Sequence, residues 1–154
     1  MFEKILFPTD FSEPSKNVLK AIEELDNECG SKSVIVVHVV DEHDVNSAAN
    51  LEGFYSISID HIREEIQKEF NRQAKAFMKA VTEELFQKGY DRDKIKTMVL
   101  FGNPAEEIVK LAKMENVNCI VMGSRGRGQV AEFILGSTSD KVIRKAKCPV
   151  LVIK

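Results

Sequence analysis

The segment that most restricts the fold is the run at residues 33–40, where valine and isoleucine fill every position except Ser33 and His38. β-Branched residues favour strands, and a strand that is apolar on both faces belongs inside a parallel sheet covered by helices. Parallel neighbours need a long crossover between them, usually a helix. The run therefore predicts an α/β chain in which strands and helices alternate.

Further apolar runs and helical patterns complete this alternation. The other strands are expected at residues 5–7, 95–101, 119–122 and 149–153. Helices are expected from the cap Ser12 to Gly30, at about 59–88, after the cap Asn103, and around Val142 and Ile143. Residues 45–58 have no regular period, and we expect a mobile loop there.

This order of elements predicts one architecture. Crossovers between parallel strands are right-handed, which leaves few topologies, and we expect an open five-stranded parallel sheet of strand order 3-2-1-4-5 with helices on both faces. The length of 154 residues predicts a single domain, 1–154. In such a sheet the winding reverses between the first and fourth strands. Ligands bind outside the carboxyl ends of strands at that switch point.

Two distinctive loops are predicted to meet at the switch point. The first strand ends at Pro8, Thr9 and Asp10, and the fourth ends at Met122 and Gly123. The second of these loops is rich in glycine, which lets a ligand lie directly against main-chain N–H groups.

The glycine-rich loop has the features of a phosphate site. Gly123, Gly126 and Gly128 follow a strand, and Gly136 comes just before a helical pattern. Unpaired N–H groups and the dipole of a helix start attract anions, and nearby hydroxyl and guanidinium groups strengthen the attraction. Those groups are Ser137, Thr138, Arg125 and Arg127. A loop that merely turns the chain remains the alternative.

The spacing of the glycines distinguishes between the known phosphate-binding sequence motifs. No Gly-Lys-Ser/Thr sequence occurs, so a P-loop is excluded. Residues 126–131 fit G-x-G-x-x-[GA], but the match follows a late strand and has no acidic residue at 147–151, so a dinucleotide site is rejected. The pattern that fits is G-x2-G-x9-G-[ST], formed by Gly123, Gly126, Gly136 and Ser137.

This last pattern resembles the signature of the ATP-binding branch of the universal stress protein family. Residues 5–12, 36–41, 122–126 and 148–152 resemble four of its segments, in the family's order and over nearly the whole chain. The resemblance implies a Rossmann-like fold of the adenine nucleotide alpha hydrolase type. It also implies a bound ATP, AMP or ADP, with Mg²⁺ or Mn²⁺ held through the phosphates rather than by a dedicated set of protein ligands.

The resemblance also assigns the binding residues. Glycines, Ser137 and Thr138 would cradle the phosphates, Asp10 would lie near the ribose, and apolar residues would wall the adenine. The implied nucleotide-binding residues are Pro8, Thr9, Asp10, Phe11, Ser12, Val39, Met122, Gly123, Ser124, Arg125, Gly126, Arg127, Gly128, Gly136, Ser137 and Thr138. For Asp10, a helix cap beside Ser12 remains the alternative.

The expected function is that of an ATP-binding regulatory protein in the stress response. Phosphoryl transfer needs an oriented nucleophile, and no residue is required by the sequence to act as its general base, so we expect little or no intrinsic hydrolysis and name no catalytic residue. A slow ATPase and an interaction protein that uses no nucleotide both remain open. The family resemblance implies a homodimer through the apolar edge strand at 149–153. A regulatory protein partner is expected, without an identity.

Composition limits the other partners. A net charge of −2 and a pI near 6.0 argue against nucleic acid binding. No apolar run is long enough to span a membrane. We expect residues 1–4 to lead into the first strand and not to form a signal peptide. Cys29, Cys119 and Cys148 are odd in number and far apart, which favours free thiols in the cytoplasm. His38 is interpreted as a half-buried histidine that packs or accepts one hydrogen bond, and residues 41–44 as a solvated loop rather than a metal site.

Overall fold

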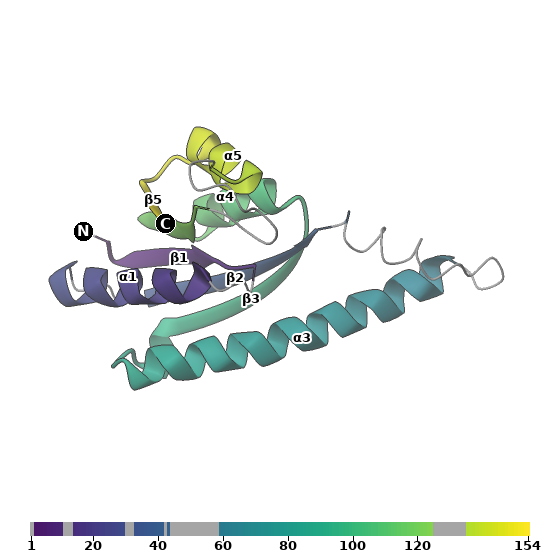
Figure 1. Cartoon of the computed structure of the whole chain (residues 1–154), viewed down its shortest axis with the longest axis horizontal. Helices are drawn as coiled ribbons and strands as arrows, with labels where there is room; N and C mark the ends of the chain where they lie inside the picture. Colours follow the sequence, from purple (N-terminus) through teal and green to yellow (C-terminus); the bar gives the residue numbers. More distant parts are fainter. Residues whose placement is uncertain (1, 11–13, 30–32, 42, 44–58, 125–134) are drawn as a thin grey trace.

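The computed structural model describes residues 2–10, 14–29, 33–41, 43, 59–124 and 135–154. Within them, five strands form one sheet in which every neighbouring pair is parallel (Figure 1). The order along the sheet is β3-β2-β1-β4-β5, which confirms the predicted order. The strands are β1 (Lys4–Pro8), β2 (Ser33–Asp41), β3 (Ile95–Gly102), β4 (Cys119–Gly123) and β5 (Val150–Ile153).

Helices cover both faces of this sheet, as predicted. The helices are α1 (Pro14–Cys29), α3 (Ile59–Gln87), α4 (Pro104–Met114) and α5 (Ser137–Lys145), and a 3₁₀ turn η1 (Arg92–Lys94) precedes β3. Helices α1 and α3 lie on one face, and α4 and α5 on the other (Figure 1). The helix α3 is longer than the strands that it covers, and its start extends past the carboxyl edge of the sheet (Figure 1).

Two apolar cores result, one on each face. Ile5 and Phe7 of β1 enter the core under α1 and α3, while Leu6 between them enters the core under α4 and α5. All three side chains are fully buried. Alternation of side chains along a strand explains why β1 and β2 read as continuous apolar runs, since both faces are packed.

The boundaries of several elements differ slightly from the prediction. The strands β1, β2 and β3 each extend beyond the predicted run at their carboxyl end, to Pro8, Asp41 and Gly102, because pairing with a neighbour continues past the apolar residues. The last strand begins one residue later than predicted, at Val150. The predicted cap Ser12, the helix end Gly30 and the loop at 45–58 lie outside the described residues.

Candidate functional site

The strands β1 and β4 stop pairing with each other at the predicted switch point, while each stays paired with its other neighbour. Pairing of β1 with β2 continues to Pro8, and the N–H of Thr9 then donates to the carbonyl of Val37 over 2.9 Å. Pairing of β1 with β4 stops earlier, at Leu6 and Ile120. The strand β4 instead stays with β5, and the N–H of Ser124 donates to the carbonyl of Ile153 over 2.7 Å. The carboxyl ends of β1 and β4 therefore follow different neighbours.

Pro8 explains why the β1–β4 pairing ends. In a strand, successive N–H groups point to opposite sides, and the N–H of Thr9 points to β2. The nitrogen of Pro8 consequently faces β4, where a proline has no hydrogen to donate. From the sequence, Pro8 was expected only to end the strand. In the structure it also removes the next main-chain hydrogen bond between β1 and β4.

Gly136 and the first turn of α5 contact the end of β4. The N–H of Gly136 donates to the carbonyl of Ser124 over 2.8 Å, and the Oγ of Ser139 donates to the carbonyl of Gly123 over 2.9 Å. Ser124 and Ser139 are buried. The start of α5 is therefore fixed against the carboxyl end of β4, beside the division of the sheet. Ser139 contributes to this arrangement, although it was not among the predicted binding residues.

The start of α5 is suited to an anion. Gly136 is its N-cap and has no side chain, so the cap residue itself accepts no hydrogen bond from the first turn. By contrast, Asn103 caps α4 by accepting from the N–H of Glu106 over 3.3 Å. The first turn of α5 contains Asp140, but the Nε–H of Arg144 is shared between both oxygens of its carboxylate, each at 3.0 Å, and this bond lowers the pKa of Asp140. A helix start with free N–H groups attracts negative charge.

The glycines at 123 and 136 are not required by backbone conformation. Gly136 has φ −63° and ψ 151°, which any residue can adopt. Gly123 has no positive φ either, in contrast to Gly89 and Gly102. Backbone conformation therefore does not account for glycine at either position.

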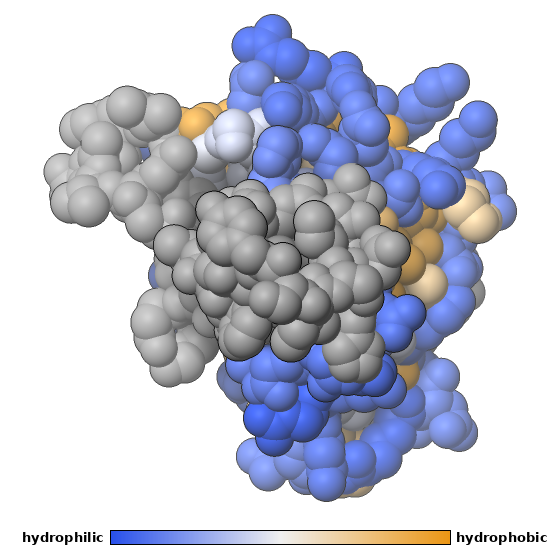
Figure 2. Space-filling model, turned by 90° about the vertical axis from the view of Figure 1, so that its right-hand side faces the viewer, coloured by the Kyte–Doolittle hydropathy of each residue, from blue (hydrophilic) through white to orange (hydrophobic). Residues whose placement is uncertain are grey.

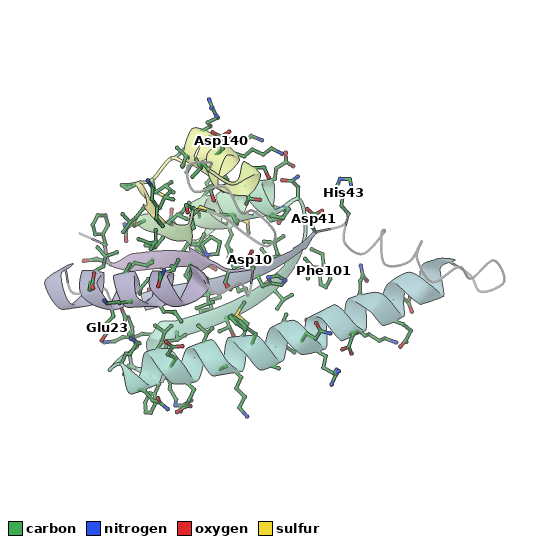
Figure 3. The ribbon with its side chains drawn as sticks, viewed as in Figure 1. Asp10, Glu23, Asp41, His43, Phe101 and Asp140 are labelled. Carbon is green, nitrogen blue, oxygen red and sulfur yellow. The ribbon has the colours of Figure 1, made fainter. Side chains whose placement is uncertain are left out.

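The other half of the predicted site lies at the end of β1. Thr9 is buried, and its carbonyl accepts a 2.8 Å hydrogen bond from Nδ1 of His38 on β2. Because a carbonyl oxygen can only accept, His38 donates this bond through Nδ1, and its side chain is half-buried as predicted. Asp10 is half-buried where β1 ends, and Asp41 and His43 lie where β2 ends, on the same side of the molecule (Figure 3).

The residues predicted to wall the adenine lie at or near the carboxyl ends of β1, β2 and β4. Met122 is buried in the core under α4 and α5, and Val39 packs against the same core. Pro8 and Thr9 are buried at the end of β1. Figure 2 looks onto the side toward which the strands run, where the described surface is mainly hydrophilic with small apolar patches.

Six of the predicted binding residues fall outside the described part of the chain: Phe11, Ser12, Arg125, Gly126, Arg127 and Gly128. Gly123, Ser124 and Gly136 are brought together, and the exposed Ser137 and half-buried Thr138 follow in the first turn of α5. Within the described ranges, no three histidine, cysteine, aspartate or glutamate side chains are grouped so as to hold a metal ion.

Comparison with known proteins identifies the family. The sequence model of the universal stress protein family matches residues 1–154. The chain belongs to the universal stress protein family. Universal stress protein MJ0577 of Methanocaldococcus jannaschii is 36% identical over 159 residues, which cover 100% of this chain and 96% of that protein. Universal stress protein YxiE of Bacillus subtilis is 32% identical, with all of both chains covered.

The solved structures agree with this assignment. The structure of MJ0577 superimposes with a TM-score of 0.84 at 35% identity, covering 100% of this chain and 96% of that one. This universal stress protein therefore has the α/β Rossmann-like fold of its family, and a role in the stress response follows from membership. None of the helices in the described part of the chain has the length and apolar character needed to cross a bilayer.

Proposed function

We propose that this universal stress protein is a single-domain regulatory protein that binds an adenine nucleotide, ATP in the first place, where β1 and β4 separate. The observation that carries the proposal is the start of α5. Its uncapped first turn lies against the end of β4, between two glycines that no backbone conformation requires. Such a turn offers N–H groups to phosphate oxygens at close range.

We assign different residues to the phosphates, the base and the ribose of the nucleotide. Gly123, Gly136, Ser137 and Thr138 would hold the phosphates, together with Arg125, Gly126, Arg127 and Gly128. Met122, Val39, Pro8 and Thr9 would contact the base, and Asp10, beside Phe11 and Ser12, would contact the ribose. A divalent ion, Mg²⁺ or Mn²⁺, would be held mainly through the phosphates and would neutralise part of their charge.

Two family structures support an adenine nucleotide as the ligand class. A universal stress protein from Archaeoglobus fulgidus was solved in complex with dAMP, and another universal stress protein in complex with cAMP. They are 23% and 20% identical to this chain and on their own establish the shared fold. The proposal for this chain therefore depends on its own glycines and the start of its own α5.

The experiment is calorimetric titration of the purified protein with ATP and Mg²⁺, for wild type and for Gly136→Val. The valine side chain would occupy the space of the phosphates, and losing hydrogen bonds to a charged ligand weakens binding about tenfold or more. Ala146→Val is the matched control. It adds a larger side chain at the other end of α5, where φ is −64° and ψ is 144°. Equal affinity in Gly136→Val and wild type would show that the site lies elsewhere.

Hydrolysis is tested separately from binding. Asp10 and Asp41 both lie at the carboxyl edge and could order a water molecule (Figure 3). We propose that turnover is slow or absent. Steady phosphate release by the pure protein that disappears in Asp10→Ala would instead identify an ATPase.

We also propose a homodimer through the edge strand β5 and a reducing, cytoplasmic setting. The dimer proposal is supported by the position of β5 at the end of the sheet, because an uncovered edge invites pairing. The setting is supported by the free thiols of Cys119 and Cys148.

A further inference from the structure

His38 is a polar residue inside the otherwise apolar strand β2, and its side chain is half-buried. Burying an imidazole is unfavourable unless it is hydrogen-bonded. Its Nδ1 lies 2.8 Å from the carbonyl oxygen of Thr9, which can only accept. Nδ1 therefore carries a hydrogen, and in the neutral ring Nε2 is the acceptor. This contact joins β2 to the residue just before Asp10.

Thr9 is held from β2 at both of its main-chain groups. Its N–H donates to the carbonyl of Val37 over 2.9 Å, and its C=O accepts from His38. The ladder between β1 and β2 ends at Pro8 and Val37, so these two bonds extend the attachment of β1 one residue beyond the regular pairing. The orientation of the Thr9–Asp10 peptide is thus set by a side chain of the neighbouring strand.

A fixed Thr9 carbonyl fixes the next N–H group. Across a trans peptide, the C=O and the following N–H point in opposite directions, and the described chain contains no cis peptide. Because the carbonyl of Thr9 points to His38 on β2, the N–H of Asp10 points away from β2. The strand β4 lies on that other side of β1. The N–H of Asp10 is therefore directed toward the side where β1 and β4 separate.

We infer that His38 is a positioning residue of the site: through the Thr9 carbonyl, it orients the Thr9–Asp10 peptide and so places the main chain and carboxylate of Asp10 at the switch point. The consequence for ligand affinity rests on the proposed function. The orientation of the peptide does not, and it can be tested without any ligand.

The binding test compares His38→Leu with His38→Asn. Leucine fills a similar volume and donates no hydrogen bond, whereas the side-chain amide of asparagine can place a donor where Nδ1 lies. We expect the Kd for ATP to rise about tenfold in His38→Leu, as for one hydrogen bond lost at a charged site. In His38→Asn it should stay within about threefold of wild type, since the bond to Thr9 is kept. A purely structural role would give the opposite order, because leucine is the better residue in a packed strand.

The ligand-free test records the ¹H–¹⁵N resonance of Asp10. It should shift in His38→Leu and return close to the wild-type position in His38→Asn, with thermal unfolding showing that both variants are folded. An Asp10 resonance unchanged in His38→Leu would overturn the inference, and so would equal ATP affinity in His38→Leu and wild type. If the wild type itself binds no ATP, the proposed function fails, while the Asp10 resonance still decides whether His38 orients the peptide.

Discussion

At the scale of single residues, the two cysteines near the start of β4 and β5 lie on opposite faces of the sheet. Cys119 is part of the core under α1 and α3, whereas Cys148 packs against the core under α4 and α5. Side chains that point apart cannot form a disulfide without moving the backbone. Burial raises the pKa of both thiols, and for Cys119 the nearby Cys148 raises it further. Both groups should therefore be unreactive in the folded protein.

We predict slow alkylation of Cys119 and Cys148 by iodoacetamide at pH 7.5, because only the thiolate reacts and burial disfavours it. Peptide mass spectrometry should find at least about tenfold less modification of each in the native protein than in urea, where the thiols regain an ordinary pKa. The unfolded sample is the control for intrinsic reactivity. Rapid native labelling of Cys119, or a 119–148 disulfide peptide, would contradict the packing described above.

At the scale of elements, the separation of β1 from β4 depends on a missing donor at Pro8. We predict that Pro8→Ala lets the two strands pair for one more residue, because alanine restores an N–H that faces β4. The new amide at position 8 should exchange its hydrogen much more slowly than a free peptide. ATP binding should weaken as the strands close together. If the amide exchanged at the rate of an unstructured chain, Pro8 would not be the reason for the separation.

The same elements show how far sequence alone could go. Continuous apolar runs and caps such as Asn103 predicted the strands, α4 and the strand order, because these depend on local pattern and on chirality. The turn η1 was missed because its three residues, Arg92–Lys94, contain no apolar pattern and depend on the cap Asp91.

The candidate site was predicted only in outline. Strand order was sufficient to bring the end of β1 next to the end of β4. It could not predict that the imidazole of His38 reaches the Thr9 carbonyl or that Ser139 bonds to Gly123. Both contacts join residues far apart in sequence through side-chain geometry, which has no periodicity along the chain. In the sequence, the position of His38 within an apolar run indicated that its ring would need a hydrogen-bond partner. It did not indicate that this partner is the carbonyl of Thr9.

At the scale of the whole molecule, Glu115 links three elements at the amino edge of the sheet. It follows α4, and its carboxylate contacts the ammonium groups of Lys96 on β3 and Lys4 on β1. The hydrogen bond from Lys96, helped by the charges of Lys96 and Lys4, lowers the pKa of Glu115 below its ordinary value. A carboxyl with a lowered folded pKa stabilises the protein above its unfolded pKa, and this contribution is lost as the pH falls through the folded pKa.

We therefore predict that Glu115→Gln lowers the free energy of unfolding at pH 7 and has little effect at a pH below the folded pKa of Glu115. Urea unfolding of both proteins between pH 3 and pH 7 measures this, and their curves should converge toward the acid end. The difference should also shrink in high salt, since the group is near solvent. A difference that stayed constant across the pH range would mean that Glu115 acts by packing and not by charge.

The edge strand β5 is the surface through which we propose that two copies associate. The carbonyl of Pro149 accepts from the N–H of Ile120 on β4, and the carbonyl of Ile153 accepts from the N–H of Ser124, just after β4. Since successive residues of a strand point to opposite sides, the main-chain groups of Val150 and Val152 face outward from the sheet. Leu151 between them keeps an exposed apolar side chain. This edge offers a second copy both unpaired main-chain groups and apolar surface.

We predict that the wild type sediments as a dimer at micromolar concentration and that Val152→Pro sediments as a monomer. Proline at residue 152 removes only an outward N–H, so the far-ultraviolet circular dichroism should stay that of the wild type. Leu151→Pro is the contrasting variant, because the N–H at 151 faces β4 and its loss should disrupt the pairing of β4 with β5. A wild type that is monomeric would exclude the dimer. A Val152→Pro variant that remains dimeric would place the interface on another surface, since the outward rung at 152 is then not needed for association.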